Sequence, residues 1–229
     1  MILILSWLIT FLSHRLTPVR YNRFGSFPAS SFAWQDNREA QLKSVAKRIA
    51  RLIAQLLVLP AACLAGFGRW HEPYLFFAHL FALLPGMPGS YLRVAYYGFA
   101  LEGVGPGCHI ALGSFFAHAE ASLGPRVGIG AFCVLGKLDI GEGTQLASHV
   151  HILSGSKQHT RDEAGRLVDE GRSFRRILIG EHCWIGSGAI VLADVGEKST
   201  IGAGAVVRQP LGPFVKASGN PAQVIPPAS

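Results

Sequence analysis

The stretch "LGPRVGIGAFCVLGKLDIGEGTQLASHVHI", residues 123–152, carries an apolar residue at every fifth or sixth position. The repeated residues are Leu123, Ile129, Leu135, Ile140, Leu146 and Ile152, and glycine directly follows the first four. This period fits neither the 3.6 residues of a helical turn nor the alternation of an ordinary strand, but a solenoid of very short strands produces it. We expect one apolar side chain per repeat to enter a shared core. The adjacent glycine should let the backbone turn a corner without a Cβ clash.

The same pattern resumes further along the chain, after an interruption. Its apolar residues are Ile179, Ile185, Val191, Ile201 and Val207. Between Val191 and Ile201 the spacing is ten residues where two full repeats would give twelve, which predicts one shortened coil. The interruption, residues 153–177, is a charged loop excursion that contains a single histidine, His159.

The charge of the chain is concentrated before the repeats. The 229 residues are 49% apolar and 15% charged, with a net charge of +7, which indicates a folded protein rather than a disordered one. Residues 1–70 hold nine Lys/Arg against two acids, whereas residues 71–229 hold twelve of each, so the first segment accounts for the whole excess. Because this basic segment is also very apolar, it favours an anionic membrane surface over nucleic acid as the partner.

An amphipathic helix is predicted between Asp36, where a capping-box pattern with Glu39 begins, and a break at Pro60. Two apolar runs, residues 59–68 and 74–89, follow it and are too short individually to span a bilayer as ordinary helices. These runs form either a helical cap buried on the main domain or a monotopic, partly embedded hairpin. Residues 1–100 are therefore interpreted as a helical membrane-associating region, and residues 101–229 as the repeat domain.

Other sequence features narrow the class of protein. The first twelve residues are too few to span a bilayer and lack the basic start and the cleavage site of a secretory signal. The four cysteines stand 45, 25 and 50 residues apart, so they match no metal-binding spacing and are expected to be thiols in a reducing compartment. We accordingly expect no metal and no nucleic-acid partner.

The repeats resemble those of the hexapeptide-repeat acyltransferases, which include sugar, antibiotic and serine O-acetyltransferases. The resemblance covers about residues 105–225 and is carried mainly by "CWIGSGAIVL", "STIGAGAVV" and "SGNPAQVI". It implies a mainly β fold, a left-handed parallel β-helix with three repeats per coil, and a homotrimer with active sites between neighbouring prisms. "LLPGMPGSYLR" is similar to a segment of the relatives that modify exopolysaccharide or lipid-linked glycans.

The resemblance also explains the interruption, because in this family a loop at this point delivers a histidine to the cleft between subunits. It implies that His159 is the catalytic base. An imidazole with a pKa near about 6.5 can remove a proton from an attacking hydroxyl at neutral pH. The carboxylate that would orient His159 stays open among four loop residues, which are Asp162, Glu163, Asp169 and Glu170.

Three further histidines are candidate contacts of the substrate. His149 and His151 occupy alternate positions before the loop, so on one strand their side chains would face opposite ways. His118 stands at the front of the repeat region and could line the acceptor side.

For the donor, the resemblance implies a coenzyme A groove along the last coils. The implied donor-binding residues are Trp184, Ser187, Ala203, Gly219 and Asn220. Small residues there would let the backbone approach a ligand closely, while Arg208 and Lys216 could contact the phosphates.

These observations lead to one expected function and two alternatives. The expected function is O-acyl transfer, with acetyl as the expected acyl group, from acyl-CoA to a saccharide or lipid-linked glycan at the cytoplasmic face of the bacterial inner membrane. One alternative is a non-catalytic β-helix scaffold of a membrane glycan complex. The other is a hexapeptide-repeat carbonic anhydrase, for which His118, His149 and His151 would have to bind a metal although the family's ligand spacing is absent.

Overall fold

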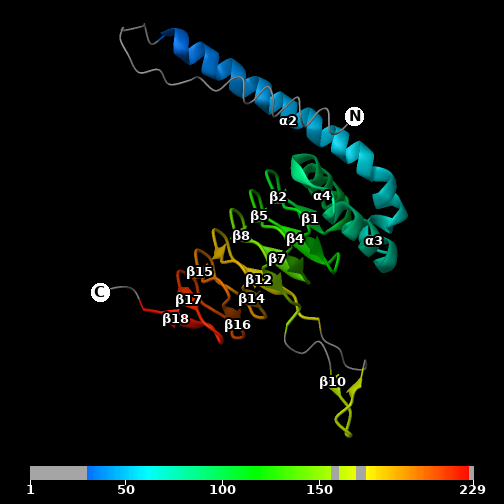
Figure 1. The fold of residues 1–229 in the computed structure, drawn as a ribbon, viewed down its shortest axis with the longest axis vertical. Helices are drawn as coiled ribbons and strands as arrows, with labels where there is room; N and C mark the ends of the chain where they lie inside the picture. Colours follow the sequence, from blue (N-terminus) through cyan, green and yellow to red (C-terminus); the bar gives the residue numbers. More distant parts are fainter. Residues whose placement is uncertain (1–29, 156–159, 169–173, 227–229) are drawn as a thin grey trace.

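The computed structural model describes residues 30–155, 160–168 and 174–226. A helical segment comes first, followed by a solenoid of about six coils, and the last two helices of that segment cover the first coil (Figure 1). The helices are α2 (Ser30–Leu64), the short 3₁₀ helix η1 (Gly66–Gly68), α3 (His71–Ala82) and α4 (Gly86–Ala100). The expected mainly β solenoid, preceded by helices, is confirmed.

The solenoid is a prism whose three faces are parallel sheets, and the chain visits them in the order A, B, C. Face A consists of β1 (Gly103–Val104), β4 (Ala121–Leu123), β7 (Leu138–Ile140) and β12 (Ile177–Ile179). Face B consists of β2 (His109–Ile110), β5 (Gly128–Ile129), β8 (Gln145–Leu146), β13 (Trp184–Ile185), β15 (Thr200–Ile201) and β17 (Lys216–Ser218), with β18 (Gln223–Ile225) antiparallel at its end. Face C consists of β3 (Phe115–Phe116), β6 (Val134–Leu135), β9 (His151–Ile152), β14 (Ile190–Val191) and β16 (Val206–Val207).

The repeated apolar residues form the core, as their period predicts. Ile129 aligns with Leu146 on face B, and Leu135 aligns with Ile152 on face C. All four side chains are buried. Each coil therefore stacks its apolar side chains on those of the next coil, and no single coil encloses its own core.

The shortened coil is accommodated on face A. Between β14 and β15 the chain crosses this face at Val195, which forms single bridges to Ile179 above and Leu211 below instead of a full strand. Val195 is buried, so the coil keeps its core residue although its crossing of face A is reduced to one bridge.

The glycines after the apolar residues serve close packing between coils rather than an unusual backbone angle. A Cβ on Gly124 would lie 2.7 Å from the backbone nitrogen of Glu142, and one on Gly141 would lie 2.5 Å from that of Glu181. The left-handed backbone angles occur two residues later, and side-chain-bearing residues such as Arg126 adopt them as well as glycine. The expected Cβ clash is therefore with the next coil.

Helix α2 differs from its sequence prediction at both ends. It begins at Ser30 rather than near Asp36, and it continues through Pro60 to Leu64. Proline removes one helical hydrogen bond. The residues after it, Ala61 and Ala62, are buried, and this packing holds the last turn in helical form.

Helices α3 and α4 dock on the first coil through buried polar side chains. The Tyr74 hydroxyl donates to the carbonyl of Phe116 at 2.9 Å, and Tyr97 and Phe116 pack edge to face. Helices α3 and α4 thus pack on the first coil. Within the residues described, no helix combines the length and the apolarity that crossing a membrane would require.

Candidate active site

The excursion leaves the prism at the edge between faces C and A, and a small polar cluster closes its base. Ser154 is 2% exposed and its hydroxyl accepts a hydrogen bond from the Lys137 amide at 2.8 Å. The chain returns at Arg175, whose amide donates to the Ser154 carbonyl at 2.9 Å and whose guanidinium pairs with Asp194. These contacts fix the two ends of the excursion beside each other without interrupting the stack.

Part of the excursion is a hairpin that stands away from the prism, formed by β10 (Thr160–Arg161) and β11 (Leu167–Val168) (Figure 1). Asp162 accepts hydrogen bonds from the amide and the guanidinium of Arg166, both at 2.8 Å, so its carboxylate stabilises the hairpin turn. Glu163 is exposed in that turn. His159, the predicted base, lies outside the described residues, directly before β10, and so do Asp169 and Glu170.

His118 lies at the same edge as the base of the excursion. Its ring lies 5.1 Å from that of Phe174, just before the chain rejoins the prism, and 6.1 Å from that of His71 on α3. Partial burial lowers the pKa of His118 below its ordinary value of 6.5. The imidazole is therefore neutral at pH 7 and able to accept a proton.

The predicted donor residues gather mostly along the opposite edge of face C, where it meets face B. Ser187 and Ala203 occupy the same turn in successive coils, and the Gly204 amide donates to the Ser187 carbonyl at 2.8 Å. Gly219 continues the column in the last coil, since its carbonyl accepts from the Val206 amide at 3.0 Å. Asn220 follows in the exposed final turn. The column presents small, exposed residues whose backbone a ligand could approach.

Three other predicted donor residues lie beside this column or away from it. Trp184 is 51% exposed on face B, and Lys216 lies two strands below it in the same outward row. Arg208 is exposed after β16, at the edge between faces C and A, so face C separates it from the column. Lys216 is thus the predicted phosphate-binding cation that the fold brings near the donor turns.

His149 and His151 do not share a strand. His149 forms the turn before β9 with a φ of 60°, and its ring stacks on that of Phe132 at 5.4 Å. The expectation that both occupy one strand is wrong, because the strand is only two residues long and the turn between faces takes up His149. His149 lies in the coil above Ser187, whereas His151 lies in the middle of face C, between Val134 and Ile190.

Face C therefore connects the two predicted parts of the site. The donor column and His149 flank one edge, while His118 and the base of the excursion flank the other. The outward row between them is apolar except for His151 and consists of Phe115, Val134, His151, Ile190 and Val206.

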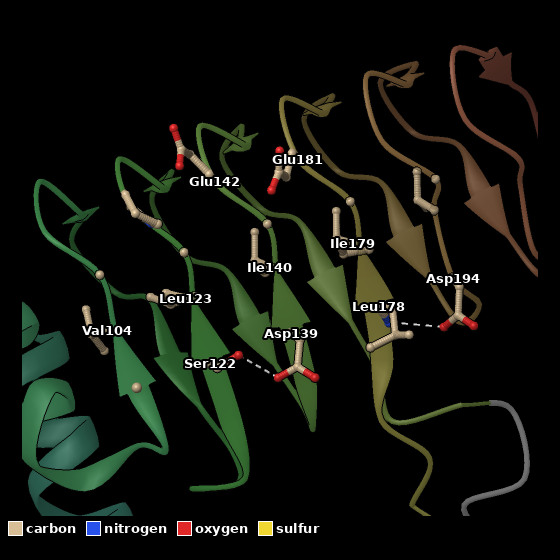
Figure 2. A pocket seen from close by; sticks show the side chains of 18 of the residues that line it. Val104, Ser122, Leu123, Asp139, Ile140, Glu142, Leu178, Ile179, Glu181 and Asp194 are labelled. Carbon is tan, nitrogen blue, oxygen red and sulfur yellow. Dashed lines mark hydrogen bonds between the residues drawn. The ribbon is translucent and has the colours of Figure 1, made fainter.

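A hollow of about 910 Å³ runs along face A (Figure 2). Three of its four carboxylates have basic partners. Asp139 accepts from the Ser122 hydroxyl at 2.6 Å and from Arg176 at 3.1 Å. Asp194 pairs with Arg175, and Glu142 pairs with Arg126. The fourth carboxylate is that of Glu181, and the rest of the lining is glycine and apolar residues of successive coils. This hollow contains none of the predicted site residues, and its chemistry is that of a sheet surface.

The arrangement does not provide the metal site of the carbonic anhydrase alternative. His118, His149 and His151 occupy the two opposite edges and the middle of face C. Across the residues the structure describes, no three His, Cys, Asp or Glu side chains are grouped as metal ligands.

Sequence reasoning did not identify two residues at the C–A edge. Lys137 pairs with Glu120 at 2.7 Å, and its ammonium lies 6.0 Å from the centre of the Phe174 ring. Lys137 directly follows a repeat glycine, and this position could have marked the edge. Nothing in the periodic pattern marks Phe174.

No protein-family model and no curated protein matches the chain. Among solved structures, a maltose O-acetyltransferase from Clostridium difficile 630 is similar at a TM-score of 0.55 and 22% identity, covering 73% of this chain and 91% of that one. PerB from Caulobacter crescentus, solved with CoA and GDP-perosamine, has a TM-score of 0.43 and 21% identity over 54% of this chain, which spans only 50% of its length. The polySia-specific acetyltransferase NeuO has a TM-score of 0.45 and 21% identity over 54% of this chain, which spans 59% of its length. The chain thus shares its β-solenoid fold with a sugar acetyltransferase.

Proposed function

We propose that the protein is an acyltransferase that moves an acyl group, acetyl in the simplest case, from acyl-CoA to a hydroxyl of a saccharide or lipid-linked glycan. One observation carries the proposal. The donor turns Ser187, Ala203 and Gly219 stack along one edge of face C, and the excursion that contains His159 starts from the other edge. The fold shared with the maltose O-acetyltransferase supports this assignment.

In this proposal His159 acts as the general base. Its neutral imidazole takes the hydroxyl proton while the acceptor oxygen attacks the thioester carbonyl, which gives a tetrahedral intermediate. The carbon–sulfur bond then breaks, the new ester forms, and the imidazolium returns its proton to the CoA sulfur. No acyl-enzyme is needed, because the acceptor attacks the thioester directly.

The donor would lie along the column of small turns. Exposed backbone at Ala203 and Gly219 can approach the pantetheine arm, Trp184 offers an exposed apolar surface beside it, and Lys216 can pair with phosphate. His118, neutral and in contact with the ring of Phe174, is suited to contact the acceptor on the other side.

A homotrimer completes the site in this proposal, since a neighbouring prism would close the open face between the two edges. The apolar row on face C is consistent with a covered surface. Light scattering in mild detergent should give the mass of a trimer, and a fully active monomer would contradict this part of the proposal.

The helical region would hold the enzyme on the cytoplasmic face of the bacterial inner membrane. The side of α2 turned away from the prism exposes a row of apolar side chains. They are Leu42, Val45, Ile49, Leu52, Ile53 and Leu56. This row, together with exposed Phe76 of α3 and Leu83 directly after that helix, is the kind of surface that lies in a lipid interface.

The test compares glycan isolated from cells with and without the protein, together with CoA release from acetyl-CoA by the purified full chain. The proposal expects acceptor-dependent CoA release and an added acyl mass on the glycan. Loss of that mass in mild alkali identifies an ester, whereas an alkali-stable mass identifies an amide and N-acyl transfer. Absence of both CoA release and added mass would contradict the proposal and favour the scaffold.

A further inference from the structure

A second cavity, of about 340 Å³, lies between the helices and the first coil, at the edge between faces A and B. Helix α2 contributes Lys47, Arg51 and Gln55 to its lining, and α4 contributes Ser90 and Tyr91 together with apolar residues. The remaining wall is the turn from Val104 to His109. The cavity shares no residue with face C or with the excursion, so acyl transfer leaves it without a role.

The lining is basic and rich in hydrogen-bonding groups. It contains two cations, a hydroxyl, a phenol and an imidazole, but no carboxylate. Within the described part of the chain, no carboxylate forms an ion pair with Lys47 or Arg51. Two cations four residues apart on one helix face, without a counter-ion among the residues that the structure describes, favour an anionic ligand.

His109 is held in place for such a ligand. Its Nδ1 lies 2.9 Å from the hydroxyl of Ser90, a side chain that is 5% exposed. Burial, together with the charge of Arg93, lowers the pKa of His109, so the ring is neutral at pH 7. When Nδ1 accepts the Ser90 proton, Nε2 carries the ring proton and is a hydrogen-bond donor. A phosphate, with several acceptor oxygens, matches this set of donors.

The placement of the cavity points to phosphate carried by a lipid. The side of α2 that holds Lys47 and Arg51 continues into buried Val58 and Ala62, which pack on the body of the protein. The opposite side exposes the apolar row that includes Leu52 and Leu56. The basic groups are therefore turned toward the prism, just behind a surface suited to lipid, and are poorly placed for general attraction to a flat membrane.

We propose that this cavity binds the phosphate group of a membrane lipid, such as the phosphate of a lipid-linked glycan acceptor. The lipid source rests on the membrane location given under the proposed function. Lys47 and Arg51 pair with the phosphate. The Nε2–H of His109, whose ring is positioned by Ser90, donates a hydrogen bond to it. Met87 lines the cavity, is 55% exposed and borders the path of the lipid chain.

The experiment measures binding of the full chain to phosphatidylcholine vesicles with and without long-chain polyprenyl monophosphate, by flotation and without acyl-CoA. The readout is the ratio of the two partition coefficients, so general membrane binding cancels. Arg51→Gln should lower this ratio about tenfold, as expected for loss of a charged hydrogen-bonding partner. Arg48→Gln is the matched control: it removes the same charge one residue before the apolar Ile49, on a side chain that does not line the cavity, and should change the ratio less than about twofold.

A second variant blocks the cavity without changing charge. Gly98 lines the cavity on α4, and a Cβ there meets no atom within 4 Å, so Gly98→Leu should fit the helix and fill part of the space. It should lower the ratio about as much as Arg51→Gln, while circular dichroism and thermal unfolding show the fold intact.

The outcomes separate the possible sources of the anion. A lower ratio of partition coefficients in Arg51→Gln and Gly98→Leu, but not in Arg48→Gln, supports the proposal. Equal loss in Arg51→Gln and Arg48→Gln, with Gly98→Leu unaffected, overturns it in favour of surface charge. If inorganic phosphate removes the preference for polyprenyl phosphate, the lipid source is overturned in favour of free phosphate. If phosphatidylglycerol at equal charge removes it, a lipid-linked acceptor is overturned as the source of the phosphate. A wild-type ratio of one overturns the site itself, and acyl transfer would be unaffected by that result.

Discussion

Gly141 illustrates how a single residue sets the spacing of the coils. The nitrogen of Glu181 in the next coil would lie 2.5 Å from a Cβ at this position, closer than any real Cβ contact. Gly124, Gly180 and Gly196 are crowded in the same way. Gly212 occupies the equivalent position in the last coil, where no further coil follows, and a Cβ there meets no atom within 4 Å.

We therefore expect Gly141→Ala to lower the free energy of unfolding by about 1–3 kcal/mol, the usual cost of forcing extra atoms into a packed interior. Gly212→Ala should change it by less than about 0.5 kcal/mol. Chemical denaturation of the two variants measures the difference. Equal effects would mean that the glycines are required for backbone conformation rather than for the stacking of coils.

At the scale of elements, Arg93 fastens the helices to the solenoid. It is 1% exposed, and its guanidinium donates to the carbonyls of Ile110 at 2.9 Å, Phe81 at 3.0 Å and Leu84 at 2.7 Å. These carbonyls belong to the first coil, to α3 and to the turn before α4. One planar side chain with five N–H donors thus donates hydrogen bonds to buried carbonyls of three elements at once, which lysine could not do.

Arg93→Met should destabilise the protein by about 3 kcal/mol or more, because it leaves buried carbonyls without donors. The exposed Arg69→Met is the control and should change stability by no more than about 0.5 kcal/mol. Denaturant titration followed by tryptophan fluorescence gives both values. A loss as small as that of the control would show that apolar packing alone holds the helices on the first coil.

The elements differ in how far the sequence could predict them. The solenoid core followed from its period, because each apolar residue stacks on an equivalent residue of the next coil and the pattern keeps its phase. The C-terminal end of α2 could not be predicted from the sequence, since burial of Ala61 and Ala62 outweighs the local preference of Pro60 to end a helix. Likewise, the turn at His149 could not be told from a strand residue, because strands here are only two residues long.

At the scale of the whole molecule, the site was predictable only in part. The resemblance in the last coils predicted Ser187, Ala203 and Gly219 as donor residues, and the fold stacks them because equivalent turns coincide from coil to coil. It did not indicate that Arg208 lies across face C, since the register of the shortened coil depends on the three-dimensional winding. The basic cavity behind α2 was not predictable either, because its walls come from residues 47 and 109, far apart in the chain.

The exposed apolar row of α2 leads to a prediction about the whole molecule. Leu56 is 71% exposed, and Leu56→Ser should weaken partition of the full chain into phosphatidylcholine vesicles by up to about 2 kcal/mol, the transfer energy of a leucine side chain. Leu178→Ser, 51% exposed on face A, is the control and should leave partition unchanged. Equal losses in flotation assays would mean that the helices do not form the membrane-facing surface.

The central claim is acyl transfer from acyl-CoA with His159 as base. It is tested most directly by CoA release under saturating acetyl-CoA, with glycan from cells that lack the protein as acceptor, for wild type, His159→Ala and His149→Ala. The account predicts a loss of about 10²- to 10⁴-fold in His159→Ala with unchanged thermal stability, and a small effect in His149→Ala. Wild-type kcat/KM should rise with pH through about 6.5, because only the neutral imidazole accepts the proton. Near-normal turnover in His159→Ala together with an inactive His149→Ala would contradict the account and place the base on the coil.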